Sequence, residues 1–133
     1  MSRLSERIEN FNNAFELYKE MCSGYISDKK NNAYRLGLAQ SFEIVSELGW
    51  KVLKDYLFQE GIDVRTPKET IKEAFQKEVI KNGQTWIDII DARNLTSHEY
   101  NTDKVNILLE SISSIYYQEL SEFKNWLGTI DGK

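Results

Sequence analysis

Residues 38–57, LAQSFEIVSELGWKVLKDYL, decide the fold of this 133-residue chain. Apolar positions recur in this stretch at intervals of three and four, which places them on one face of an α-helix. The face consists of Leu38, Phe42, Val45, Gly49, Val52 and Tyr56, and it is widened by Leu48, Leu53 and Leu57. We predict a long helix from about residue 30 to residue 60, with Gly61 as the residue that ends it.

The same spacing recurs toward the N-terminus and predicts an amphipathic helix that ends near Gly24. Its apolar stripe consists of Leu4, Ile8, Phe11, Phe15, Tyr18, Cys22 and Tyr25. After the long helix, residues 66–69, TPKE, combine a capping threonine, a proline for the first turn and a glutamate, which together form a capping box. A short helix should follow, with Ile71, Phe75 and Val79 facing inward, and end near residues 82–83.

Two further helices complete the chain. One is expected from about residue 84 to Arg93, and the other is a long helix that begins after a cap at residues 101–103. The apolar side of the last helix consists of Val105, Leu108, Ile112, Ile115, Tyr116, Leu120, Phe123 and Leu127. No stretch shows a sustained alternation of period two, so we predict no sheet. The fold class is therefore all-α: an antiparallel up-and-down bundle of about five helices, three long and two short, in a single domain over residues 1–133.

Composition limits the function. The single cysteine, Cys22, cannot form an internal disulfide, fits a reducing cytoplasm and lies on an apolar stripe as a core residue. No apolar run approaches the roughly 18 residues of a membrane span, so we expect a cytoplasmic protein without a membrane partner. The net charge of −4 argues against broad binding to nucleic-acid backbone, but it leaves room for a small local basic site.

The helix over residues 30–60 is apolar over a wider arc than one small bundle needs. Trp50 lies beside its main stripe, and the last helix adds Tyr116, Tyr117 and Trp126. Such an arc predicts a second buried face, most simply that of a twofold homodimer. The alternative is that the arc packs against the two short helices of the same chain.

Residues 93–100, RNLTSHEY, form a polar cluster around the only histidine of the chain. His98 can act as a general base or acid near neutral pH, Arg93 can hold a phosphate, and Asn94 can orient either group. These groups suffice for metal-independent cleavage of RNA, in which the 2′-hydroxyl attacks the adjacent phosphate. We expect no metal and no cofactor, because one histidine without a nearby cysteine lacks the ligands of a zinc site. The alternative is that His98 is a capping or surface residue.

The spacing within this cluster limits how its members can meet. On one straight helix Arg93 and His98 would lie roughly 140° apart. The two side chains converge only if the helix ends or bends between them, or if a second copy of the chain brings its own set. Asp88 and Asp91 could hold a cation, but Asp91 more simply orients Arg93 or remains in solvent.

The cluster resembles the Arg-x4-His-x-Tyr motif of HEPN domains, here Arg93, His98 and Tyr100. Residues 40–43, 48–57, 66–69, 74–75, 86 and 91–98 also follow the order of the family called nucleotidyltransferase substrate-binding proteins. That family is similar to the HEPN toxins of MNT–HEPN toxin–antitoxin pairs. The resemblance spans roughly residues 5 to 125, nearly the whole chain.

This resemblance implies a bundle like the C-terminal domain of kanamycin nucleotidyltransferase, and a homodimer with the motif in a cleft at its interface. It implies a type VII-like pair, in which a separately encoded minimal nucleotidyltransferase is the antitoxin. Arg93 and His98 would carry metal-independent ribonuclease activity on RNA, and Asn94 would be the polar residue of the motif. The antitoxin would transfer AMP from ATP to Tyr100 and so block RNA sterically and by charge.

Two other functions remain open on the residues alone. The chain could be a non-catalytic substrate-binding or docking subunit of its nucleotidyltransferase, or a structural helical dimer with a vestigial site. The acidic net charge favours these two, because a ribonuclease usually has a more basic surface.

Overall fold

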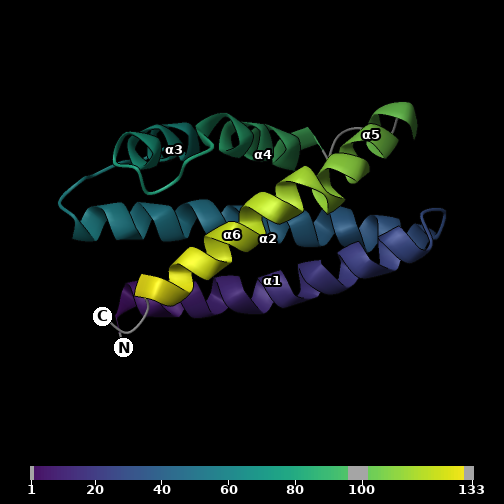
Figure 1. Ribbon diagram of the computed structural model, residues 1–133, viewed down its shortest axis with the longest axis horizontal. Helices are drawn as coiled ribbons and strands as arrows, with labels where there is room; N and C mark the ends of the chain where they lie inside the picture. The colour runs from purple at the N-terminus through teal and green to yellow at the C-terminus, as the bar shows by residue number, and fades with distance from the viewer. Residues whose placement is uncertain (1, 96–101, 131–133) are drawn as a thin grey trace.

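The computed structural model describes residues 2–95 and 102–130, and these residues form helices without any strand (Figure 1). The predicted all-α bundle is confirmed. Its elements in order are α1 (Arg3–Ser27), α2 (Asn32–Gln59), α3 (Pro67–Gln76), α4 (Gly83–Leu95), α5 (Thr102–Ser113) and α6 (Ile115–Ile130). The long helices α1 and α2 run antiparallel, α3 and α4 follow one another along α2, and α5 and α6 cross diagonally (Figure 1).

The predicted stripe of α1 is confirmed, since all seven of its residues are buried in the core. Ser2 caps the helix by accepting a hydrogen bond from the Ser5 amide at 3.1 Å. The helix continues beyond Gly24, and the Asp28 amide closes it by donating to the Gly24 carbonyl at 3.0 Å. Cys22 is a core residue, as predicted, and its side chain has no disulfide partner.

The long helix α2 ends as its glycine predicts. Gly61 adopts a φ of 85°, a left-handed conformation that other residues avoid, and the Ile62 amide donates to the Leu57 carbonyl at 2.9 Å. The chain thereby turns back toward α3, whose cap Thr66 accepts a hydrogen bond from the Glu69 amide at 3.1 Å. The predicted capping threonine is confirmed.

The helix α3 is shorter than predicted. It ends at Gln76 instead of near residues 82–83, and the following turn contains Glu78 at a φ of 60°. Only Ile71 of the three residues expected to face inward is fully buried, whereas Phe75 is 51% exposed. The buried side instead includes Thr70 and Ala74, which lie beside Ile71 on the same face.

The last predicted helix is divided at Ser114 into α5 and α6. The hydroxyls of Ser113 and Ser114 both donate to the Glu110 carbonyl, at 3.2 and 2.5 Å, and so compete with the backbone amides for that acceptor. The division changes the helical phase, which leaves Ile115 60% exposed although the continuous pattern placed it inward. The predicted cap residue Asn101 lies outside the described residues.

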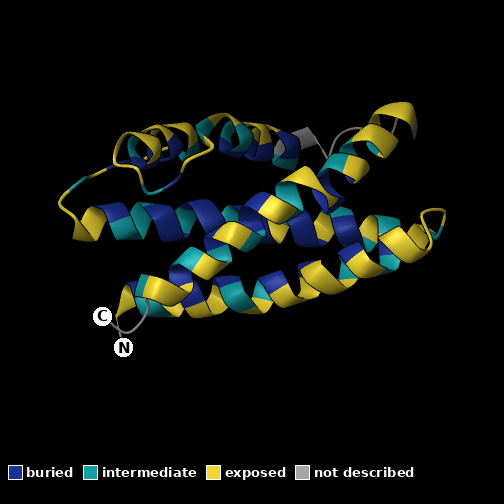
Figure 2. Cartoon of the chain, in the orientation of Figure 1, coloured by how far each residue is buried: buried dark blue, intermediate teal, exposed yellow. Residues whose placement is uncertain are grey.

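The wide apolar arc of α2 is accounted for within one chain. Helices α3 and α4 both pack on α2, which carries many buried residues along its length (Figure 2). Trp50, Leu53 and Leu57 are buried within the single chain. The arc therefore packs against the two short helices, and it does not by itself require a dimer. Within residues 2–95 and 102–130, every helix is too short or too polar to span a lipid bilayer.

Candidate functional site

The predicted site residues differ in how far the structure describes them. Arg93 lies in the last turn of α4, and Asn94 follows it on the same helix. The side chain of Asn94 lies outside the described part of the chain, as do the whole of His98 and the whole of Tyr100. The geometry of the site therefore rests on Arg93 and on the residues around it.

The apolar side of α4 determines where Arg93 lies. Trp86, Ile89 and Ala92 are buried, and they fix α4 against α2, α3 and α6. Arg93 follows Ile89 by about one helical turn, so its aliphatic stem lies along the packed side of the helix. Its side chain is only 17% exposed. A cation in the last turn of a helix is also favoured by the partial negative charge of the helix C-terminus.

The guanidinium of Arg93 is held by a carboxylate from another helix. Its Nη1 donates a hydrogen bond to Oε2 of Glu47 on α2, and the other carboxylate oxygen of Glu47 pairs with Lys51 Nζ at 3.4 Å. Glu47 thus links Arg93 to the middle of the longest helix. Sequence reasoning missed Glu47, because its partner lies 46 residues away in the chain and no local spacing connects the two.

Asp91, which the sequence offered as a residue that could orient Arg93, has a different ion-pair partner. Its Oδ1 pairs with Lys68 Nζ of α3 at 3.1 Å. The nearby Asp88 accepts a hydrogen bond from Gln84 at 2.9 Å. Burial, followed by the charges of Asp88 and Asp91, raises the pKa of Tyr116 above its ordinary value. Among the described residues, no group of acidic, cysteine or histidine side chains has the arrangement of a metal site.

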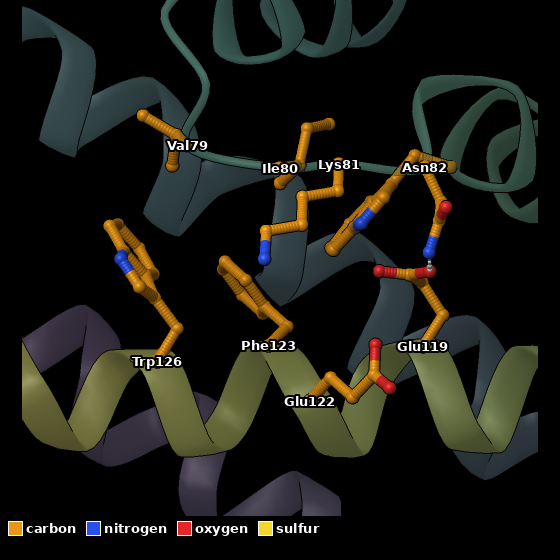
Figure 3. Close-up of a pocket in the computed structure, with 9 residues that line it drawn as sticks. Val79, Ile80, Lys81, Asn82, Glu119, Glu122, Phe123 and Trp126 are labelled. Atoms are coloured by element: carbon orange, nitrogen blue, oxygen red, sulfur yellow. Dashed lines mark hydrogen bonds between the residues drawn. The ribbon is translucent and has the colours of Figure 1, made fainter.

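A cavity of about 510 Å³ lies elsewhere, between the α3–α4 connection and α6 (Figure 3). Phe123 and Trp126 line one side, and Asn82 donates a hydrogen bond to the buried carboxylate of Glu119 at 2.7 Å. The indole Nε1 of Trp86, another lining residue, has no hydrogen-bond partner among the described residues. Arg93 does not line this cavity, so the cavity and the predicted motif are separate features.

The helical fold of the described residues is similar to that of a HEPN toxin of known structure. The chain superposes on the HEPN toxin of Shewanella oneidensis, solved in a tri-AMPylated state in complex with its MNT antitoxin, with a TM-score of 0.77. The superposition covers 97% of this chain and 99% of the toxin, at 10% sequence identity. At that identity the likeness establishes the fold alone.

The chain belongs to the family described as "Nucleotidyltransferase substrate binding protein like", which matches residues 6–129. This confirms the resemblance found in the sequence. The chain is also 34% identical over 73 residues to a protein of Haemophilus influenzae described as "Probable ribonuclease HepT". That match covers 51% of this chain and 50% of the relative, so the chain spans about half the length of the curated relative it matches.

Proposed function

We propose that this chain is the HEPN toxin of a type VII-like MNT–HEPN pair, a metal-independent ribonuclease of the cytoplasm. The observation that carries the proposal is the placement of Arg93, held by Glu47 in the last turn of α4, three residues before the segment that continues to His98. The Haemophilus relative described as a probable ribonuclease and the Shewanella toxin that shares the fold support the same function.

The proposed reaction uses three side chains and the RNA itself. The 2′-hydroxyl attacks the adjacent phosphorus, the 2′-O–P bond forms, and the bond from phosphorus to the 5′-oxygen breaks. His98 takes the proton of the 2′-hydroxyl or supplies one to the leaving 5′-oxygen, and the second copy of His98 in a dimer provides the complementary step. Arg93 stabilises the charge that develops on the phosphate oxygens, and Asn94 orients the phosphate.

The proposed homodimer is supported by the outer face of α2. Leu36 is 72% exposed and Ile44 is 44% exposed, although both are apolar. At 100° per residue both lie within about 60° of Glu47 around the helix axis. Exposed apolar side chains that lie together on one face mark a surface for a partner, and we infer that a second copy of the chain covers this one. A second copy on this face would bring the two Arg93 side chains into one cleft.

The proposed control of the toxin acts at Tyr100. A nucleotidyltransferase partner transfers AMP from ATP to the phenol oxygen, with pyrophosphate as the leaving group. The adduct adds bulk and negative charge two residues from His98, which hinders an RNA backbone of the same charge. The Shewanella toxin is itself AMPylated and bound to an MNT antitoxin, which supports this proposal for the present chain.

A second function is favoured by the cavity between the α3–α4 connection and α6. Its aromatic walls, the buried Glu119 and the Trp86 Nε1, which has no hydrogen-bond partner among the described residues, are features of a binding pocket for a small molecule. In this alternative the chain is a non-catalytic substrate-binding or docking subunit of a minimal nucleotidyltransferase. The net charge of −4 also favours it.

Expression in bacteria separates the two functions. For a ribonuclease toxin, the chain alone arrests growth, co-expression of the neighbouring nucleotidyltransferase relieves the arrest, and His98→Ala causes none. For a docking subunit, the chain forms a stable complex with the nucleotidyltransferase, and any phenotype survives His98→Ala. Equal growth of cells expressing wild type, His98→Ala and an empty vector would refute the toxin proposal.

A further inference from the structure

We propose that a basic surface pocket between the α1–α2 turn and α5 binds phosphate groups of the RNA strand that the site at Arg93 cleaves. The inference rests on the proposed ribonuclease function, which it deepens by adding a binding site outside the motif. We call this feature the basic pocket. It has a volume of about 460 Å³ and is lined by Tyr25, Lys29, Lys30, Arg35, Asn106 and Glu110.

Arg35 is fixed in the basic pocket by acceptors that carry no charge. Its Nη1 donates to the Lys29 carbonyl at 3.1 Å, and its Nη2 donates to Oδ1 of Asn106 at 2.5 Å. Within the described residues, no carboxylate forms an ion pair with this guanidinium. The side chain is therefore held in one orientation while its positive charge stays uncompensated, which is the arrangement that a bound anion needs.

The two lysines add to this charge. Lys29 pairs with Glu110 at 2.7 Å and lies over the Tyr25 ring at 5.9 Å, whereas exposed Lys30 has no ion-pair partner in the described part of the chain. Three cations and one carboxylate give the basic pocket a net charge of +2 within a chain of net charge −4. Phosphate would be drawn to this local site even though the whole surface is acidic.

In the sequence, the basic pocket and Arg93 lie on either side of the segment that carries the motif. Asn106 follows the first residue of α5, Thr102, by four positions, and Arg93 precedes the last described residue of α4, Leu95, by two. Arg93 and the pocket thus stand at the two ends of the connection that includes His98. Along α2, Arg35 and Glu47 are separated by about 18 Å at 1.5 Å per residue, which a few nucleotides of a single strand can span.

The lining also indicates which part of the RNA is bound. Tyr25 is only 2% exposed, so its ring cannot stack on a base in the way that aromatic platforms of single-strand-binding proteins do. Arginine, lysine and asparagine are residues that contact phosphate oxygens. The basic pocket therefore positions the strand without reading its sequence.

Binding is tested on the full chain carrying His98→Ala, which keeps the RNA intact during the measurement. Fluorescence anisotropy of a labelled single-stranded RNA is measured over a range of salt concentrations. Adding Arg35→Gln or Lys30→Gln should weaken binding several-fold and lower the slope of log affinity against log salt by about 1 for each lost phosphate contact. Lys30→Gln changes an exposed lysine, so its effect cannot be due to misfolding.

Lys72→Gln is the matched control, because Lys72 is an exposed lysine on α3 and its replacement changes the net charge by the same amount. Equal affinities and equal salt slopes for Lys30→Gln, Arg35→Gln and Lys72→Gln would overturn the proposal. Inorganic phosphate that displaces the RNA at micromolar concentration would also overturn it, since the pocket would then be a site for a free anion.

Cleavage kinetics distinguish failure of this inference from failure of the proposed function. In the otherwise wild-type chain, Arg35→Gln should raise KM for a long RNA and leave kcat, and the cleavage of a dinucleotide, unchanged. A wild-type chain that binds RNA through the basic pocket but cleaves nothing would refute the ribonuclease proposal and sustain the binding site. If the wild-type chain cleaves RNA with the same KM as Arg35→Gln, the ribonuclease proposal is sustained and the phosphate-binding role of the basic pocket is refuted.

Discussion

Arg93, in the last turn of α4, donates a hydrogen bond from Nη1 to Oε2 of Glu47 in the middle of α2. The pair joins the motif arginine to the helix that organises the whole bundle. Because Glu47 also pairs with Lys51 one turn later, the carboxylate is held from two sides. Glu47 thus contributes to the orientation of Arg93, although it does not belong to the motif.

Replacing Glu47 should therefore impair cleavage more than it impairs folding. Glu47→Ala removes the acceptor that orients the guanidinium, and we expect kcat for RNA cleavage to fall about 10-fold, since misplaced groups lose catalytic power. The Glu47 side chain is 39% exposed, so the free energy of unfolding should change by less than about 1 kcal/mol. Glu47→Gln, which retains an acceptor, should recover part of the activity.

The control for this series is Lys51→Ala, which removes the other partner of Glu47 and leaves Arg93 intact. Its cleavage rate should remain near that of wild type, and urea unfolding of each variant separates catalytic from structural effects. A Glu47→Ala variant that cleaves RNA at the wild-type rate would remove the positioning role.

Ile44 should be needed for the dimer. Ile44→Lys places a charge on the outer face of α2, and because the wild-type side chain is 44% exposed, the bundle should still fold. We expect light scattering after size exclusion to give a dimeric mass for wild type and a monomeric mass for Ile44→Lys, with cleavage reduced in the monomer. Leu17→Lys is the matched control, since Leu17 is 47% exposed on α1, outside the proposed face of α2, and it should remain dimeric. A monomeric wild type, or loss of the dimer only in Leu17→Lys, would exclude this face as the interface.

Tyr100 should be the residue that the nucleotidyltransferase modifies. Intact-mass spectrometry after incubation with the nucleotidyltransferase and ATP should show added AMP on wild type and none on Tyr100→Phe. The modified protein should bind and cleave RNA more weakly, because the adduct carries negative charge beside His98. The same added mass on Tyr100→Phe, or none on wild type, would show that Tyr100 is not the acceptor.

Much of the fold could be predicted from the sequence, because α1 and α2 carry long stripes whose period alone determines their buried faces. The division between α5 and α6 at Ser114 could not be predicted, because the apolar pattern continues through this position. Only the hydroxyls of Ser113 and Ser114 interrupt the backbone hydrogen bonds there. The predicted burial of Phe75 was wrong because the buried face of α3 is centred on Thr70, Ile71 and Ala74, and Phe75 lies about 100° from Ala74 around the helix axis.

The site was predicted less completely than the fold. The assignment of Arg93 to the site rests on a motif that is local in sequence and stays a prediction, whereas its partner Glu47 lies on another helix and is revealed only by packing. Arg35 and Asn106 of the basic pocket are likewise 71 residues apart in the chain. Contacts of this kind depend on how helices pack against one another, which the pattern within each helix does not specify.

Cys22 should make the protein sensitive to alkali. Burial raises the pKa of its thiol from 9.0 to about 12, although a hydrogen bond with Tyr18 acts in the opposite direction. Between these values the unfolded chain loses the thiol proton and the folded chain keeps it, so the unfolded chain binds fewer protons and the free energy of unfolding falls as pH rises above about 9.

Two measurements check this prediction. Iodoacetamide at pH 8 should alkylate Cys22 rapidly in urea and slowly in the native protein. Urea unfolding between pH 8 and pH 10.5 should show a shallower loss of stability for Cys22→Ala than for wild type. Rapid alkylation of the native chain would mean that the thiol is accessible and that its pKa is not raised by burial.

Cleavage of single-stranded RNA by the purified wild-type chain in the presence of EDTA tests the ribonuclease proposal most directly. We expect wild type to cut RNA and leave 2′,3′-cyclic phosphate ends, His98→Ala to be inactive, and Arg93→Ala to be slower by roughly 10²- to 10³-fold, as for the loss of one group that stabilises transition-state charge. The proposal would be contradicted if wild type and His98→Ala were equally inert on several RNAs. It would also be contradicted if EDTA abolished the cleavage by wild type.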